Sequence, residues 1–147
     1  MKLPSNNRVH ANTPIYAGSN FTWGEATKNG RRQISDLVIN GKLIATAASI
    51  EQRIIATAIE LDIYRSLLGN RPIWINSWYR PASVNARVGG SLWSRHQFGD
   101  AVDIRSDYLS AYQVYKILNA VHNLGGLGRY VSFTHVDWRG QKARWKT

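Results

Sequence analysis

The chain has 147 residues, a length that suits one domain with a buried core. It contains no cysteine, which excludes disulfide bonds and thiolate zinc sites, so a metal would have to be bound by histidine and carboxylate side chains. The formal net charge of +10 indicates an affinity for polyanions, and composition alone leaves nucleic acid, an anionic membrane face and the bacterial cell wall open.

Residues 1–19 are rich in Asn, Pro and Ser without a sustained period, so we expect an N-terminal extension that lies on the domain or is mobile. The compact domain is predicted over residues 20–147. No early segment has the pattern of a signal peptide, and no stretch approaches the roughly 20 apolar residues of a membrane span. We therefore expect a soluble, monomeric chain without a leader.

A helix is predicted over residues 49–69. Ser49 and Gln52 have the spacing of a capping box, and Gly69 suits the C-terminal end. The apolar residues that recur at helical intervals should face the core, and they are Ile50, Ile54, Ala58 and Leu61.

A second helix is predicted from a capping box of Ser110 and Gln113 to an end at Gly125. We expect His122 on this helix to be a surface or boundary residue. The apolar residues that should form its buried stripe are Val114, Ile117, Leu118, Val121 and Leu124.

Strands are predicted at residues 72–79, 101–105 and 130–138, where the apolar pattern has a two-residue period or a short β-branched run. Helices that alternate with strands, without a regular βαβ rhythm, indicate an α+β fold. The expected architecture is a small, mainly antiparallel sheet flanked by helices.

On the third predicted strand, His135 and Asp137 share a face with the apolar Val131 and Phe133. The two polar residues are roughly 7 Å apart along the backbone. A purely structural strand would continue with apolar residues, so this face is a candidate for chemistry.

His96, Asp103 and His135 could supply the three nitrogen and oxygen ligands that a hydrolytic zinc site needs. This requires that the strands at 101–105 and 130–138 be neighbours in the sheet. The His96 and Asp103 spacing alone is a weak signal, and on that spacing alone a structural pairing is the usual interpretation.

Four motifs in the same order resemble those of the VanY-like zinc D-Ala-D-Ala carboxypeptidases and murein endopeptidases. The segment SRHQFGDAVD matches the pattern S-x-H-x-x-G-x-A-x-D, and the others are NFTWGEATKNG, SWYRPASVNARVGG and GGLGRYVSFTHVDWRG. The resemblance runs from about residue 20 to about residue 145. It implies the fold that this family shares with the hedgehog signalling domain.

The resemblance implies one zinc ion per chain, bound by His96, Asp103 and His135. It places Arg80 beside the metal, where its planar fork would bind a substrate carboxylate or stabilise an oxyanion. The alternative for Arg80 is a structural ion pair, or a turn residue ahead of Pro81.

Relatives often carry an acidic general base three positions before the last histidine ligand, where this chain has Ser132. Asp137 is the natural replacement, because it shares the His135 face and carboxylates are scarce in this half of the chain. Its alternative role is to orient a ligating histidine.

The resemblance therefore implies a peptidase that acts on peptidoglycan stem peptides at the bacterial cell wall, either as a carboxypeptidase or as an endopeptidase. The basic surface, including the tail RGQKARWKT, would bind the anionic wall unless that tail is simply solvated. A wall hydrolase without a leader suggests a phage-type lysin or an excised domain. The alternative is a non-catalytic, zinc-containing binding relative. No nucleic-acid motif is present, so nucleic acid is not an expected partner.

Overall fold

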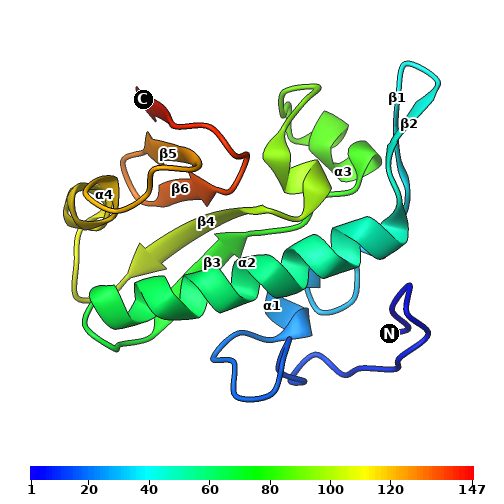
Figure 1. The fold of residues 1–147 in the computed structure, drawn as a ribbon, viewed down its shortest axis with the longest axis horizontal. Coiled ribbons are helices and arrows are strands. Elements are labelled where there is room, and N and C mark those ends of the chain that lie inside the picture. The colour runs from blue at the N-terminus through cyan, green and yellow to red at the C-terminus, as the bar shows by residue number, and fades with distance from the viewer.

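The computed structural model describes all 147 residues. A long helix, α2 (Ala47–Leu67), crosses one face of a five-stranded sheet (Figure 1). The remaining elements, in chain order, are α1 (Trp23–Thr27), β1 (Leu37–Ile39), β2 (Lys42–Ala45), β3 (Ile73–Ser77), α3 (Ala82–Arg87), the 3-10 helix η1 (Arg95–Phe98), β4 (Ala101–Ser106), α4 (Ala111–Asn119), β5 (Gly126–Arg129), β6 (Thr134–Asp137) and β7 (Ala143–Lys146).

The sheet has the strand order β3-β4-β6-β5-β7. All neighbouring pairs are antiparallel except β5 and β7, which run parallel. The predicted α+β fold with a mainly antiparallel sheet is therefore confirmed. The predicted pairing of the second and third strands is also confirmed, because β4 and β6 are adjacent and Asp103 lies directly opposite His135.

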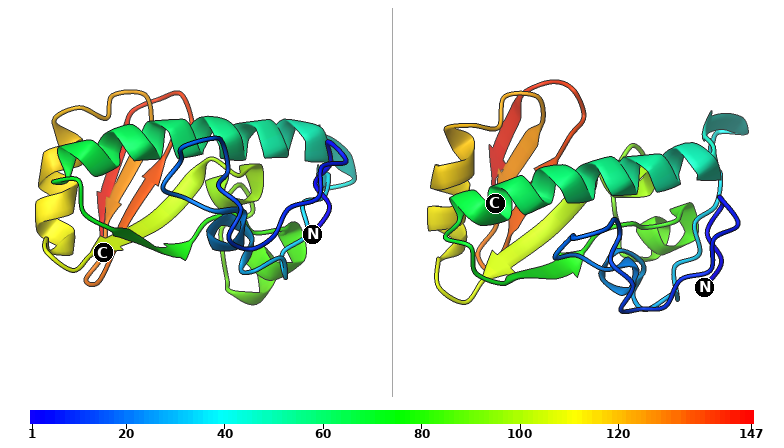
Figure 2. Two further views of the ribbon diagram at one scale, coloured as in Figure 1. Left: turned by 90° about the horizontal axis from the view of Figure 1, so that it is seen from below. Right: turned by 60° about the horizontal axis from the view of Figure 1, so that its bottom comes forward.

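Helix α2 buries its predicted apolar residues Ile50, Ile54, Ala58 and Leu61 in the same core as the sheet residues Val102, Ile104 and Val136. The helix lies across the sheet in both views of Figure 2. The predicted capping box at Ser49 is wrong: the helix begins one turn earlier, and the Thr46 side chain accepts a hydrogen bond from the Ser49 amide. Gly69 adopts a positive φ of 100° just after the helix, as its predicted role at that end requires.

Helix α4 begins at the predicted capping box, in which Ser110 and Gln113 cap each other's backbone groups. It ends at Asn119, earlier than predicted, and only Val114 and Leu118 of the expected stripe are buried. The other three members of that stripe are exposed, and they are Ile117, Val121 and Leu124.

The prediction of a surface or boundary position for His122 is also wrong. Its side chain is buried, and both ring nitrogens have partners there: Nδ1 lies 2.6 Å from the Tyr64 hydroxyl and Nε2 lies 2.7 Å from the Asp137 carbonyl.

The basic tail is not a free terminus, although Lys142 and Lys146 in it are exposed. Its residues 143–146 form β7, which pairs with β5 along its whole length. Arg144 donates hydrogen bonds to the carbonyl oxygens of His122 and Gly125, so this cation stabilises the fold.

The first 19 residues lie against the domain, with Leu3, Val9 and Ile15 in the main core. Asp62 on α2 accepts hydrogen bonds from the side chains of Tyr16 and Ser19, which fixes this segment to the helix. No helix in the structure is both long enough and apolar enough to cross a bilayer.

Candidate metal site and its pocket

The backbone brings together three predicted ligands from three neighbouring elements. Asp103 and His135 are cross-strand partners on β4 and β6, and His96 lies on η1, just before β4. Gly99 ends η1 with a positive φ of 83°, a conformation that glycine adopts without strain. This turn directs the chain from His96 into β4, so that all three side chains meet at one point.

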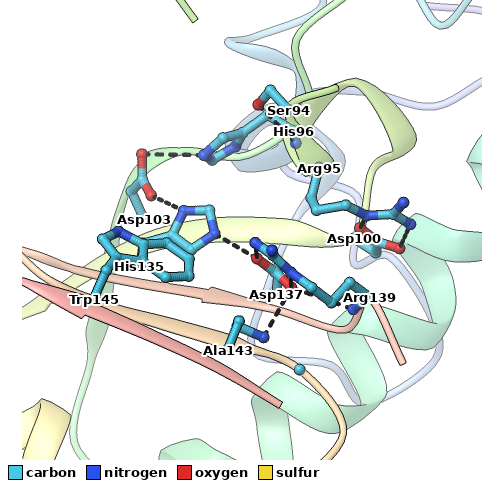
Figure 3. Close-up of polar contacts among 12 residues, drawn as sticks. Ser94, Arg95, His96, Asp100, Asp103, His135, Asp137, Arg139, Ala143 and Trp145 are labelled. Atoms are coloured by element: carbon cyan, nitrogen blue, oxygen red, sulfur yellow. Dashed lines mark hydrogen bonds and ion pairs between the residues drawn. The ribbon is translucent and has the colours of Figure 1, made fainter. Parts of the chain in front are cut away.

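The three side chains converge closely, as Figure 3 shows. Asp103 Oδ1 lies 2.9 Å from His135 Nδ1, and Asp103 Oδ2 lies 3.3 Å from His96 Nε2. One potential ligand atom from each residue falls within 4.8 Å of the others, and all three residues are buried. Two imidazole nitrogens and one carboxylate oxygen are donors that zinc accepts, and three such ligands leave a coordination position for another molecule. The donor set therefore fits a catalytic zinc ion.

The outward-facing nitrogen of each histidine has its own partner. His96 Nδ1 lies 2.6 Å from the Trp78 carbonyl oxygen, and His135 Nε2 lies 2.8 Å from Asp137 Oδ2. Both partners can only accept, so each of these nitrogens can carry the proton of a neutral imidazole. With a cation in place of the direct contacts to Asp103, His96 Nε2 and His135 Nδ1 would present their lone pairs to it.

Asp137 is fully buried and its two oxygens are occupied. Oδ1 accepts hydrogen bonds from the Gly126 amide and from the amide and Nε of Arg139, and Oδ2 accepts from Arg139 Nη2 at 2.6 Å and faces His135. Burial raises the pKa of this carboxyl, but the hydrogen bonds from Arg139 and His135 outweigh it and hold the pKa below its usual range.

Burial and polar contacts also have opposite effects on the pKa values of the cluster. Burial raises the pKa of Asp103, but its contacts with His135 and His96 lower it by more, so the carboxyl is ionised at neutral pH. Burial lowers the pKa of His135, whereas the carboxylates of Asp103 and Asp137 raise it to a value above the usual one. The ionised Asp103 carboxylate between the two imidazoles is the group of this cluster that is suited to a cation.

The cluster forms part of the wall of an open pocket of about 640 Å³. Asp103 is the only carboxylate that lines it, whereas three arginines do so: Arg80, Arg95 and Arg139. Aromatic residues form the other side, where the Trp145 ring lies 5.1 Å from the His135 ring and donates its Nε1 hydrogen to the Tyr130 hydroxyl.

Arg80 lies at the pocket wall, just after β3 and ahead of Pro81. Its Nε donates to Ser77 Oγ at 3.1 Å, and its Nη2 is 3.4 Å from Asp103 Oδ2, which is a long contact for an ion pair. No partner in the protein binds Nη1. All five predicted site residues, including Arg80 and Asp137, therefore lie at or directly behind one pocket.

Two residues of the site were missing from the sequence prediction. Arg139 holds Asp137 through both of its oxygens, and Trp145 covers His135. The two-residue period of a strand could have indicated Arg139, because it follows His135 and Asp137 at the same spacing. Nothing in the tail sequence indicated that Trp145 would return to the site on a parallel edge strand.

Residues 32–137, well over half of the chain, match the family described as peptidase M15. A segment of 92 residues is 34% identical to the zinc D-Ala-D-Ala carboxypeptidase of Streptomyces albus G. That segment is 63% of this chain and 32% of the relative, so the chain spans about a third of the length of the curated relative that it matches. The family match includes all five predicted site residues and ends on the last of them, Asp137. The chain belongs to the peptidase M15 family.

Proposed function

We propose that this chain is a zinc-dependent peptidase that hydrolyses an amide bond in the peptide part of bacterial peptidoglycan. The observation that carries the proposal is the buried convergence of His96, Asp103 and His135 at the wall of an open pocket. Membership of the peptidase M15 family supports the reaction class, and the name of the Streptomyces relative supports zinc and a cell-wall substrate.

The three side chains would hold one zinc ion through His96 Nε2, one Asp103 oxygen and His135 Nδ1. When bound, zinc supplies a Lewis acid that polarises a carbonyl oxygen and makes water acidic enough to react near neutral pH. The protein contributes the positions of the ligands. Trp78 and Asp137 keep the two imidazoles in the tautomer and orientation that direct a lone pair at the ion.

Arg80 is the residue that we assign to the substrate. Arg80 lines the pocket, and its Nη1 group has no partner in the protein. A guanidinium in this position can bind a substrate carboxylate or the oxygen that gains charge as the amide carbon becomes tetrahedral. A non-catalytic binding relative would be expected to lack a cation beside the metal ligands, so Arg80 argues against that alternative.

Of the two roles expected for Asp137, we propose that it orients His135. The support is its complete burial and the four hydrogen bonds from Gly126 and Arg139, which leave little capacity to take a proton from the pocket. A carboxylate that holds the far nitrogen of a ligating histidine is a common arrangement in zinc sites.

Digestion of purified peptidoglycan with the zinc-loaded chain, followed by mass identification of the new termini, tests the function. The proposal predicts new amino and carboxyl termini within the stem peptides or their cross-links, which also separates a carboxypeptidase from an endopeptidase. A His96→Ala, His135→Ala variant should release none of them. Tight binding of wall fragments without any new terminus would instead support the non-catalytic alternative.

A further inference from the structure

The face of the sheet that carries the metal ligands extends beyond the metal cluster. Val102 and Ile104 of β4 are buried in the core with α2, so the alternation along the strand places Asp103 and Arg105 on the opposite face. Trp74 of β3 is the Cα partner of Arg105, and antiparallel partners have their side chains on the same face. Trp74 and Arg105 therefore lie on the face of the metal ligands, roughly 7 Å along the strand from Asp103.

This part of the sheet adjoins the aromatic side of the pocket. The pairing of β4 with β6 extends to Ile104 and Thr134, so Arg105 and Phe133 are the next residues past that pair. Phe133 lines the pocket and stacks on Tyr130, with the ring centroids 4.4 Å apart and the planes 10° apart. The pocket is thus continuous with the face that carries Arg105.

The Trp74 ring is exposed and yet fixed. The residue is 45% exposed, and its Nε1 donates a hydrogen bond of 2.8 Å to Asp107 Oδ2. Arg105 Nη1 donates to the other Asp107 oxygen at 3.3 Å, and its guanidinium carbon lies 5.5 Å from the centroid of the Trp74 ring. One carboxylate therefore holds both side chains, so a ligand would meet an aromatic ring that is already oriented.

We propose that Trp74 and Arg105 form a binding site for a saccharide ring of the peptidoglycan glycan strand. The proposal rests on the proposed peptidase function and adds a second part of its substrate, because stem peptides are attached to the sugars of that strand. The C–H groups of a sugar ring are attracted to the negative face of an indole. Arg105 Nε and Nη2 have no partner in the protein, so they can donate to the hydroxyl and carbonyl oxygens at the edge of the sugar.

An uncharged sugar ring suits this site better than a single nucleic-acid strand does. Bases also stack on aromatic side chains, but a strand is bound by cations that follow its phosphates. The arginine of this site is paired with Asp107, so the site carries little net charge, although the whole chain has a net charge of +10. This local neutrality favours a ligand that binds by stacking and hydrogen bonds.

A stem peptide that carries its disaccharide and the same peptide without it test the site. With the zinc-loaded wild type, the KM should be about tenfold lower for the disaccharide form at a similar kcat, the scale of one ring stacked on an aromatic side chain. Trp74→Ala should lose this difference between the two substrates. Trp74→Phe keeps an aromatic face and should keep most of the difference.

The matched control is Tyr112→Ala, which removes another aromatic side chain, 52% exposed, from α4. It should keep the full difference between the two substrates. Equal KM values for both substrates in the wild type, or a difference that persists in Trp74→Ala, overturn the saccharide site and leave the peptidase function in place.

Titration with an oligomer of N-acetylglucosamine, which has no peptide, gives a measurement that needs no hydrolysis. In the nitrogen–proton NMR spectrum, the indole signal of Trp74 is the one missing from Trp74→Phe, and it should shift as the oligomer is added. An unchanged signal, or a shift with a single-stranded oligonucleotide and none with the sugar, overturns the saccharide site. Cleavage of neither peptide, together with a sugar-dependent shift of the Trp74 signal, overturns the peptidase function and leaves the saccharide site.

Discussion

Each histidine of the cluster is fixed at both of its nitrogens. The Trp78 carbonyl holds His96, and the Asp137 carboxylate holds His135, so neither ring can rotate without losing a buried hydrogen bond. Asp137 is in turn held by Arg139 through both oxygens. The orientation of a ligand thus depends on residues that never contact the metal.

Replacement of Asp137 tests this dependence. Asp137→Asn keeps the size of the side chain but loses the charge that holds His135 and Arg139, so zinc affinity should fall about 10- to 100-fold. Activity at limiting zinc should fall with it and recover when zinc is added, and a competition titration with a chelator measures the change. Asp107→Asn, which removes an exposed acid near Arg105, is the matched control and should leave zinc affinity unchanged.

Normal zinc affinity together with slow turnover would contradict the orienting role of Asp137. If Asp137→Asn binds zinc normally but turns over 10²- to 10⁴-fold more slowly at saturating zinc, its carboxylate is a general base.

Arg80 should contribute to catalysis far more than to folding. Its contact with Asp103 is long at 3.4 Å, and its Nε hydrogen bond goes to a serine hydroxyl. Arg80→Ala should therefore lose activity by about 10²-fold or more, the scale of one lost oxyanion donor, with little change in Tm. Kinetics and thermal denaturation of the same preparation measure both quantities, and a large fall in Tm with activity retained would support a structural ion pair.

At the level of elements, the strand β6 with its histidine and aspartate was the most predictable part of the molecule. A buried strand usually continues with apolar residues, so His135 and Asp137 on one face of β6 indicated a functional site from the sequence alone. The pairing of β6 with β4 then adds Asp103 to it. The capping box at Ser110 located the start of α4 equally well.

The elements that the sequence did not predict are short or glycine-rich. Strand β5 is only four residues long and contains Gly126 and Gly128, so it has little β propensity of its own. The basic β7 is a strand only because β5 offers it an edge. The hairpin of β1 and β2 did carry a signal, Asn40-Gly41 with positive φ at both positions, which is typical of a tight hairpin turn.

Gly99 connects the fold to the site, and its replacement is an element-level test. A Cβ atom there would lie 2.8 Å from Ile54 Cγ1 while the backbone stayed at a positive φ of 83°. Gly99→Ala should lower the free energy of unfolding by about 1–3 kcal/mol and weaken zinc binding, because the turn sets His96 relative to Asp103. Chemical denaturation and zinc titration measure the two effects.

Gly69→Ala is the matched control for this glycine. Gly69 also has a positive φ, but its Cβ would meet nothing within 4 Å, and it lies at the end of α2. It should lose stability through backbone strain while zinc affinity stays unchanged. Equal loss of zinc affinity in both variants would contradict the specific role of the Gly99 turn.

At the scale of the whole molecule, the excess of basic residues predicts a salt-dependent action on the intact wall. A net charge of +10 should concentrate the chain on an anionic surface, and screening at physiological ionic strength limits that attraction to about 8 Å. Cleavage of whole sacculi should fall as salt rises, whereas cleavage of a small uncharged test peptide should hardly change. Equal salt sensitivity for both substrates would remove the role of the surface charge.

The central claim is that His96, Asp103 and His135 form one zinc site, and metal analysis of the purified chain tests it most directly. After equilibration with zinc and removal of the unbound metal, the wild type should contain about one zinc ion per chain. A folded His96→Ala, His135→Ala variant should contain almost none, because one carboxylate ligand would remain. Full zinc content in the double variant, or none in the wild type, would contradict the claim.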